Sequence, residues 1–520
     1  MPSYLLAVDV GTRSARAGVF DPAGAMLARA VAPLDLHEGP QQGGEYAADQ
    51  IWQAVCRATR AALAEARIDP ASVAGLALDA TCSLVLRDRD GAPLPLGPEG
   101  RDTIAWFDHR AVAEAADCTA TGHRLIDHLG GSMSPEMQTP KLMWLKRQRP
   151  DLWARLGSAR DLCDHLTECA TGAAAASACA LAAKWAYLPE HGGWQDDFLA
   201  QVGLEDLRAQ AALPDRAAPM GQPVGTLTTA AAEALGLPAG LPVAAGLIDA
   251  YAGALGTVGL NADGARRASL TLIAGTSNCI MALTPEPLFA PGIWGPSRDT
   301  VLPGWWTSEG GQTSAGAALE WVLARWPSDG APRPGHAEVL ARIAELLAEQ
   351  GPAFGAHLDV LPDFSGNRSP LSDPSARALV SGLSLDRSFD ALCALYWRTA
   401  VALALGVRQI VAQVTPEGGA PALTIAGGLA RTTLLKQLFA DVTGLPVMRP
   451  EAEDVVLLGT AIAAASAAGL YPDLPAAARA MTRLGKVLTP DPQRRAAYER
   501  DYQVMQRLQA MRAELAAMKR

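Results

Sequence analysis

Apolar and polar residues at the start of the chain follow the two-residue period of β-strands. Residues 4–10 form an apolar run that Asp9 interrupts, and residues 15–20 alternate between apolar and polar. The residues between them, 11–14, read Gly-Thr-Arg-Ser, which is typical of a turn. The chain therefore opens with a predicted strand, a turn and a second strand.

The same pattern occurs again near the middle of the chain. Residues 267–281 contain an apolar run, the turn Gly-Thr-Ser at 275–277, and a second apolar run. The two Gly-Thr pairs lie almost half the chain length apart. A further strand over 423–428 ends in a Gly-Gly pair before a helix. Two similar halves of this kind predict two lobes with a cleft between them.

Helices are predicted between these strands. The spacing of apolar residues indicates helices over about 48–66 and 386–413, and residues 73–79 form another strand. The alanine-rich stretch 170–183 is too apolar for a linker, so we expect packed helix or a close-packed turn there. Residues from about 484 onward predict a charged helix packed on one lobe. Strands that alternate with helices indicate an α/β protein.

Composition narrows the class of protein. The chain has 520 residues, of which 49% are hydrophobic and 19% charged, which excludes a disordered protein. The net charge of −10 without a basic cluster argues against a nucleic-acid partner. Residues 455–472, the longest uncharged stretch, favour a buried helix over a membrane span. Eight scattered cysteines without a Cys-x-x-Cys pair, and a start without a basic segment, lead us to expect a cytoplasmic protein with reduced thiols.

The two Gly-Thr turns are candidates for phosphate binding. Glycine lets backbone amides approach an anion, the hydroxyls of Thr12 and Ser14 add donors, and Asp9 beside them can hold magnesium through water. One Gly-Thr hairpin is most often only a hairpin, but one in each half could hold a polyphosphate from both sides. Gly427 and Gly428 could let an adenine ring or a ribose lie on the backbone. The chain has neither a Gly-x4-Gly-Lys-Ser/Thr motif nor a kinase-type glycine-rich loop with its lysine.

Lone carboxylates in apolar surroundings are the second group of candidates. Asp79 and Asp249 each end a predicted strand, and Asp108 lies in the segment 106–110, Trp-Phe-Asp-His-Arg. Asp249 is either a helix N-cap or a base that accepts a hydroxyl proton during phosphoryl transfer. The 106–110 segment is either a capped loop or a reader of polyol hydroxyls. No residue spacing indicates a structural zinc site or a Gly-x-Ser-x-Gly hydrolase.

Nine short stretches in the same order along the chain resemble the FGGY family of carbohydrate kinases, and within it the pentulose kinases that phosphorylate ribulose. The resemblance runs from about residue 4 to about residue 510. The stretches are Asp9–Arg16, Leu78–Leu84, Trp106–Ala111, Gly130–Glu136, Pro140–Leu145, Gly246–Gly253, Glu309–Gly316, Gly366–Pro370 and Ala426–Leu429.

The resemblance implies two ribonuclease-H-like, actin-like ATPase lobes that close over ATP, Mg²⁺ and a sugar. It implies that Asp249 is the catalytic base and that Asp9 orients magnesium, through water. The resemblance and the interpretation of residues 106–110 as a polyol-binding segment together give the predicted substrate contacts. These are Asp79, Thr81, Cys82, Trp106, Asp108, His109, Glu136, Lys184 and Glu309. The predicted nucleotide and phosphate contacts are Gly11, Thr12, Arg13, Ser14, Arg16, Gly275, Thr276, Ser277, Gln312, Gly427, Gly428 and Arg431.

Two positions depart from the family pattern. Ile280 stands where close relatives usually have His, and Arg431-Thr432 replaces a typical Lys/Ser-Asn pair. We predict an N-terminal lobe over 1–256, a C-terminal lobe over 257–483, a C-terminal helix over 484–520 and, by resemblance, a homodimer.

The predicted activity is ATP-dependent phosphorylation of the C5 hydroxyl of a pentulose, D-ribulose first of all. L-Ribulose, xylulose or a tetrulose are alternative substrates, and an actin-like ATPase that acts on a protein partner is a remote alternative.

Overall fold

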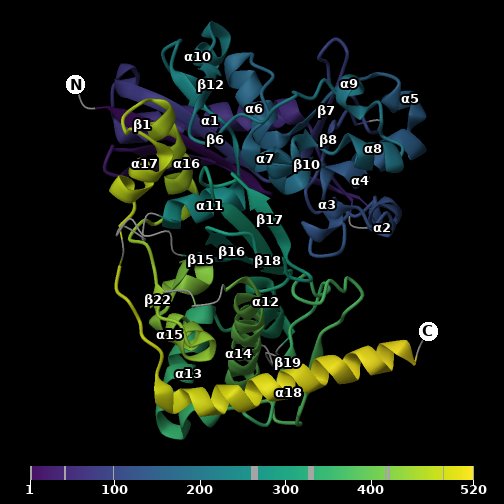
Figure 1. The fold of residues 1–520 in the computed structure, drawn as a ribbon. Helices are drawn as coiled ribbons and strands as arrows, with labels where there is room; N and C mark the ends of the chain where they lie inside the picture. The colour runs from purple at the N-terminus through teal and green to yellow at the C-terminus, as the bar shows by residue number, and fades with distance from the viewer. Residues whose placement is uncertain are drawn as a thin grey trace.

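The fold contains two large β-sheets, each with its own helices (Figure 1). The structure is a computed structural model. It describes residues 3–39, 43–97, 99–258, 268–325, 333–415, 419, 422–483 and 485–518. The predicted α/β class with two similar halves is confirmed.

The first sheet has the strand order β12-β13-β6-β1-β2-β3, with β14 also paired to β6. β1 pairs antiparallel with β2 across the predicted turn and parallel with β6. β1 is almost entirely buried because helices cover the sheet. The strands are β1 (Tyr4–Val10), β2 (Ser14–Phe20), β3 (Met26–Pro33), β6 (Val73–Ala80), β12 (Pro223–Thr226), β13 (Pro242–Ala244) and β14 (Leu247–Ile248). Its helices include α1 (Ala48–Ala66), α6 (Leu162–Thr171), α10 (Thr229–Leu235) and α11 (Asp249–Val258).

The second sheet repeats this arrangement with the order β17-β18-β16-β15-β21-β22. β15 pairs antiparallel with β16 across the second Gly-Thr turn and parallel with β21. The strands are β15 (Ser269–Ala274), β16 (Asn278–Thr284), β17 (Trp294–Arg298), β18 (Trp306–Gln312), β21 (Leu423–Gly427) and β22 (Val447–Met448). The neighbouring elements are α12 (Gly316–Arg325), α13 (His336–Gln350), β19 (Asp359–Leu361), β20 (Leu379–Ser381), α14 (Phe389–Val414), η5 (Gly428–Arg431) and α15 (Thr433–Thr443).

The second half of the sequence returns to the first lobe. α16 (Val455–Ala467) is apolar on all sides, so it is stable only when surrounded, and it packs between α11 and the strands β1 and β6. α17 (Leu474–Met481) follows it (Figure 1). The predicted lobe boundaries at residues 256 and 483 stay predictions. Residues 455–481, from the second half of the sequence, pack with the first sheet.

An insertion in the first half forms a separate core beside the first sheet. Its small sheet has the order β4-β5-β8-β7-β9. The alanine-rich stretch forms the end of α6, a turn at Gly172 with a left-handed backbone, and α7. The elements are β4 (His37–Glu38), β5 (Gly44–Tyr46), β7 (Leu84–Asp88), β8 (Thr103–Ile104), α2 (Val112–Ala120), α3 (Arg124–Asp127), α4 (Gln138–Gln148), α5 (Pro150–Trp153), β9 (Leu156–Asp161), α7 (Ala178–Lys184), β10 (Tyr187–Leu188), η3 (Pro189–His191), β11 (Gly193–Trp194), α8 (Asp196–Gln201) and α9 (Leu207–Gln210).

Two long helices complete the second lobe. α18 (Pro492–Ala517) is the predicted charged C-terminal helix, and it crosses α14 and α15 (Figure 1). Among the described residues α14 is long and apolar enough to cross a membrane, but 78% of its most apolar window is buried inside the protein. Core helices of soluble proteins pass the same test. All eight cysteines are free thiols.

Candidate active site

Four carboxylates meet at one edge of the first sheet, and we call them the carboxylate cluster. Asp9 and Asp79 lie opposite each other on the parallel strands β1 and β6. Asp249 begins α11 directly after β14, whose Leu247 pairs with Asp79. Asp454 is the N-cap of α16. The packing of α16 on this sheet therefore brings a residue from the second half of the sequence to the residues of the first.

Arginine side chains balance part of this charge. Arg16 on β2 forms an ion pair with Asp9, and its other terminal nitrogen lies 3.6 Å from Asp454. Arg29 lies 3.4 Å from the same Asp454 oxygen. The structure places Arg16 against the carboxylates of Asp9 and Asp454, and its predicted contact with phosphate stays a prediction.

Burial dominates the ionisation of the cluster. Burial raises the pKa of Asp9 to about 7, although the Arg16 guanidinium lowers it. Burial and the charge of Asp9 raise the pKa of Asp79 well above its usual value, against a hydrogen bond from the Thr460 hydroxyl. A carboxylate in this environment loses hydration that a single guanidinium does not replace. The cluster therefore favours binding of an additional cation.

Asp249 is the member of the carboxylate cluster on which the charges of Lys184 and Glu309 also act. One of its carboxylate oxygens accepts the Ala250 N–H at 2.7 Å, which is a contact at the start of its own helix. Burial raises the pKa of Asp249. The charges of Arg16, Glu309 and Lys184 also act on it, so it is close to groups of both lobes. Asp249 therefore lies at the start of a helix, and its role as a base stays a prediction.

Two buried ion pairs join the lobes, and we call them the cleft pairs because a cleft is predicted between the lobes. Lys184 at the end of α7 donates to Glu309 on β18 at 3.0 Å. Arg368 donates to Glu136 at 3.1 Å. The Trp294 ring on β17 lies under both cations, 4.4 Å from the Lys184 ammonium and 4.9 Å from the Arg368 guanidinium. These five side chains form a polar wall beside Asp249.

Pairing keeps these groups charged although they are buried. Burial opposes ionisation of Glu136, but Arg368, His109 and Lys184 outweigh it and lower its pKa to about 2. Burial also opposes the charge of Lys184, and Glu309 outweighs it and raises the pKa of the ammonium. Two carboxylates and two cations thus present fixed hydrogen-bond donors and acceptors, as recognition of a polyhydroxy compound requires.

The first Gly-Thr turn lies next to the aromatic segment of the insertion. The Thr12 hydroxyl accepts the Trp106 indole N–H at 3.0 Å, and the Gly11 N–H closes the turn on the Ser14 carbonyl at 3.0 Å. Arg13 points away, toward Glu38, and is exposed. Thr12 and Trp106 were predicted as phosphate and substrate contacts, and the structure brings them together.

The second Gly-Thr turn lies at the start of α12. The Gly275 and Thr276 carbonyls accept N–H groups of Gly316 and Ala315 at 3.0 and 2.9 Å, and the turn is exposed. Gly427 is the last residue of β21 and stands opposite Ala274. Gly275, Thr276, Gly427 and Gly428 are therefore neighbours at the ends of β15 and β21.

A side chain at Gly427 would block this place. Its φ of 93° is left-handed, and a Cβ there would lie 2.4 Å from the Ala274 carbonyl oxygen. Arg431 is exposed at the end of η5. Gln312 instead makes internal contacts, because it accepts from Asn278 at 2.7 Å and donates to the Leu403 carbonyl at 3.2 Å.

Several predicted substrate contacts are engaged within the chain. The Asp108 carboxylate accepts hydrogen bonds from the Gly44 N–H and from the Arg110 side chain, at 2.7 to 2.8 Å. The Thr81 hydroxyl shares a hydrogen bond with Ser83 at 3.0 Å. Burial raises the pKa of the Cys82 thiol to about 12, so it stays protonated. As substrate contacts these residues stay predictions.

Sequence reasoning missed four residues that complete the site. Arg368 and Asp454 supply charge, while Trp294 and Tyr251 supply aromatic walls. The Tyr251 hydroxyl lies 3.4 Å from Glu309. Arg368 lies in a family-like stretch, which was the available signal. The position of Asp454 depends on the return of α16 to the first lobe, and no local pattern indicates that.

The two departures from the family pattern have structural explanations. Ile280 on β16 points into the core of the second lobe, whereas its neighbour Cys279 faces Glu309 at 3.8 Å. Thr432 is the N-cap of α15 and accepts the Leu435 N–H at 3.4 Å. Neither residue removes a group from the carboxylate cluster or the cleft pairs.

The carboxylate cluster fits a magnesium ion. Oδ2 of Asp9 is paired with Arg16, whereas Oδ1 of Asp9 and Oδ1 of Asp79 are buried and accept no hydrogen bond from the part of the chain that the structure describes. Magnesium prefers carboxylate and water oxygens over nitrogen or sulfur. Asp9, with Asp79 beside it, would hold the ion or its waters.

Comparison with known proteins agrees with this geometry. The chain matches the N-terminal domain of the FGGY family of carbohydrate kinases over residues 4–256 and the C-terminal domain over residues 270–468. It is 39% identical to the FGGY carbohydrate kinase domain-containing protein of Danio rerio, over 99% of both chains. It is 33% identical to a D-ribulokinase of Saccharomyces cerevisiae, over 89% of this chain and 72% of that protein.

A solved structure has the same fold. The ligand-bound xylulose kinase from Lactobacillus acidophilus, 20% identical, superposes with a TM-score of 0.84 over 98% of each chain. The fold is that of two actin-like ATPase lobes, and the family match identifies the class as a sugar kinase. The chain belongs to the FGGY family of carbohydrate kinases.

Proposed function

We propose that this carbohydrate kinase transfers the γ-phosphoryl group of ATP to the C5 hydroxyl of D-ribulose, giving D-ribulose 5-phosphate and ADP. The observation that carries the proposal is the position of Asp249. Its carboxylate lies close enough to Arg16 on one side, and to Lys184 and Glu309 on the other, for their charges to act on it. A base there can reach both a sugar at the cleft pairs and a phosphoryl group beside the carboxylate cluster.

Each group has a separate task in this reaction. Asp249 accepts the hydroxyl proton as the new O–P bond forms, and its raised pKa brings it closer to the working pH of a general base. The cleft pairs, Lys184–Glu309 and Arg368–Glu136, orient the sugar by hydrogen bonds and hold the two lobes together around it. Closure of this kind excludes water, which would otherwise accept the phosphoryl group.

The phosphate groups of ATP would be bound by backbone groups of the two turns and by a magnesium ion. The half-buried turn at Thr12 and the exposed turn at Thr276 would face the phosphates from the two lobes. A magnesium ion at Asp9 would neutralise charge on the transferring phosphoryl group. The residues Gly427 and Gly428 leave room for the nucleoside.

The choice of D-ribulose is supported by the D-ribulokinase relative from yeast. Other pentuloses share the same hydrogen-bonding groups, so xylulose and L-ribulose are the competing substrates. An ATPase that acts on a protein partner does not require buried polar pairs that bind a sugar beside its base. The cleft pairs therefore disfavour the actin-like ATPase alternative. The cytoplasmic location and the homodimer stay predictions.

A substrate panel tests the proposal. ADP release with Mg·ATP is measured with D-ribulose, L-ribulose, D-xylulose, L-xylulose, erythrulose, ribitol and glycerol, for the wild type and for Asp249→Asn. We expect the highest kcat/KM with D-ribulose and loss of that turnover in the variant. Preference for another sugar would replace the substrate and keep the base. ATP turnover that ignores every sugar would overturn the proposal.

A further inference from the structure

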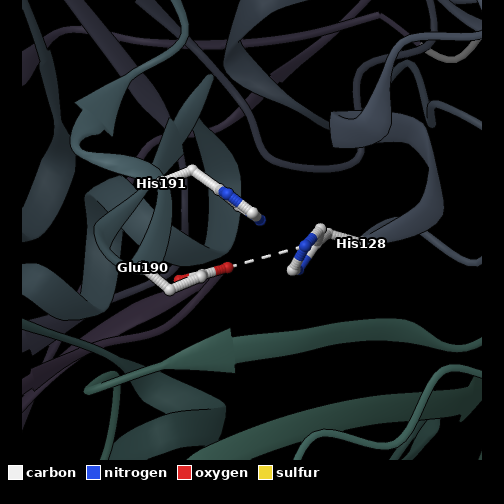
Figure 2. Close-up of side chains that lie close together, drawn as sticks. All are labelled: His128, Glu190 and His191. Atoms are coloured by element: carbon white, nitrogen blue, oxygen red, sulfur yellow. Dashed lines mark ion pairs between the residues drawn. The ribbon is translucent and has the colours of Figure 1, made fainter.

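A cluster of two histidines and a glutamate lies in the insertion, and it shares no residue with the active site. His128 follows α3, whereas Glu190 and His191 are the last residues of η3. The three side chains converge (Figure 2), and their ligand atoms all lie within 4.8 Å of one another. We propose that these residues form a binding site for a divalent transition-metal ion of the zinc type.

The hydrogen bonding of His128 determines which nitrogen faces the cluster. Its Nδ1 lies 2.8 Å from the Pro296 carbonyl oxygen. A carbonyl oxygen only accepts, so Nδ1 carries the proton, and the lone pair of a neutral ring is on Nε2. That nitrogen lies 3.5 Å from Glu190 Oε1. A histidine that donates to a backbone carbonyl with one nitrogen and keeps the other free has the usual arrangement of a metal ligand.

Glu190 supplies the second, independent observation. Both of its carboxylate oxygens are buried, and neither accepts a hydrogen bond from the described residues. The buried carboxylate thus faces the lone pair of His128, which is itself only 6% exposed. Two acceptors that face each other away from water need a proton or a metal cation between them. A metal ion supplies that charge, and His191 at the exposed edge supplies a third ligand.

The ligand set indicates the kind of ion. Two imidazole nitrogens and one carboxylate oxygen suit zinc and neighbouring transition metals, whereas magnesium prefers oxygen alone. Metal–ligand bonds of about 2.0–2.2 Å place tetrahedral ligand atoms about 3.3 Å apart. Movements of about an ångström, by side-chain rotation, would therefore bring the three ligand atoms to bonding distance of one ion. The fourth coordination position would be open to water.

The site would strengthen a joint between the two lobes. The His128 carbonyl accepts the Gly295 N–H at 2.8 Å, and the ring bonds to the next residue, Pro296 on β17. The residue before them is Trp294, whose ring lies under the cations of the cleft pairs. A bound ion would fix η3 to this joint and stabilise the folded protein.

Metal binding is tested on the full-length protein after removal of metals by a chelator. The protein is titrated with Zn²⁺ in the absence of ATP, and binding is followed by calorimetry and by the unfolding temperature. Glu190→Gln and His191→Ala are compared with the wild type. His336→Ala is the matched control, because His336 also contacts a glutamate, Glu320, at 2.7 Å but lies outside the cluster.

We expect one Zn²⁺ per chain to raise the unfolding temperature. Loss of one ligand should weaken binding at least about 10- to 100-fold, the loss that even outer-shell substitutions cause. His336→Ala should bind like the wild type. Co²⁺ absorption without a thiolate charge-transfer band would exclude the eight cysteines as ligands. Equal Zn²⁺ affinity in the folded Glu190→Gln and His191→Ala proteins, or no stoichiometric binding by the wild type, would overturn the proposal.

Discussion

The carboxylate cluster and the cleft pairs differ in how their buried charges are compensated. In the carboxylate cluster, Asp9 and Asp454 contact two guanidinium groups, those of Arg16 and Arg29, and no ion pair among the described residues reaches Asp79 or Asp249. In the cleft pairs, each carboxylate contacts one cation at about hydrogen-bond distance, and Trp294 covers both cations. One side carries excess negative charge, and the other is balanced.

The difference is visible in the ionisation of two carboxyls with similar burial. The pKa of Asp9 is raised to about 7, because burial outweighs the effect of its one arginine. The pKa of Glu136 is lowered to about 2, because Arg368, His109 and Lys184 outweigh burial. Burial alone therefore does not decide the charge of a site. An unbalanced cluster is suited to a cation, and a balanced one to a neutral polar ligand such as a sugar.

The largest expected effect is at Asp249, on which charges of both groups act. Asp249→Asn keeps the shape of the side chain but removes the proton acceptor. We expect kcat to fall by about 10²–10⁴-fold, the usual contribution of general acid–base catalysis. KM for the sugar should change only a few-fold, since the cleft pairs stay intact. Steady-state kinetics, with circular dichroism as a folding control, measures both, and an unchanged kcat would remove Asp249 from the role of base.

The second expected effect concerns the stability of the cleft pairs. Lys184→Met leaves Glu309 buried without its cation, and breaking a buried pair costs about 3–5 kcal/mol. Urea unfolding should show that loss in the free energy of unfolding. The matched control is Lys146→Met, because Lys146 pairs with Asp206 at 2.7 Å on the surface, where such pairs contribute less than about 1 kcal/mol.

A double variant separates loss of the pair from loss of packing. Lys184→Met with Glu309→Leu removes both charges, so no unpaired group stays buried, and we expect most of the lost stability to return. If the double variant were as unstable as Lys184→Met, the effect would come from packing against Trp294 and not from charge.

Much of the fold was predictable because it follows local patterns. The strand-turn-strand unit at 4–20, the helix at Ala48–Ala66 and the Gly-Thr turn at 275–277 appear as expected, since periodicity and turn residues determine them locally. The position of α16 was not predictable in this way. Its apolar sequence indicates burial, but its burial in the first lobe depends on contacts between residues several hundred positions apart.

The candidate site, like the fold, was predictable from the sequence only in part. Asp9, Asp249, Lys184 and Glu309 were recognised by resemblance and lie around one cleft. The side chain of Arg13 is exposed and paired with Glu38, and its predicted contact with phosphate stays a prediction. A turn motif determines the backbone of its residues, whereas the direction of a long side chain depends on the nearest opposite charge.

The third prediction is a gain in the free energy of unfolding, whereas the second is a loss. Asp9→Asn removes a charge from the unbalanced side, so the metal-free protein should become more stable, by up to about 4 kcal/mol at pH 8, because the pKa rises from 3.8 to about 7 and each pKa unit corresponds to about 1.4 kcal/mol. The raised pKa means that ionised Asp9 opposes folding fully above pH 7 and less as the pH falls toward 4. The gain should therefore shrink at lower pH. Urea unfolding at pH 8 and pH 5.5 measures it, and a destabilised variant would contradict the charge imbalance.

The smallest expected effect is the pH dependence of magnesium binding. A proton on Asp9 competes with the ion, so affinity should rise with pH up to about 7, the pKa of this carboxyl, and then level off. Below that pH we expect about a tenfold loss per unit for competition by one proton. Sugar binding should stay constant over the same range, because Glu136, with a pKa of about 2, does not titrate there. Stabilisation against heat by Mg²⁺ and by sugar, measured separately from pH 5.5 to 8, compares the two sides directly. If both ligands lost affinity in parallel as the pH fell, the two sides would share one titrating group, and the contrast between an unbalanced and a balanced cluster would be wrong.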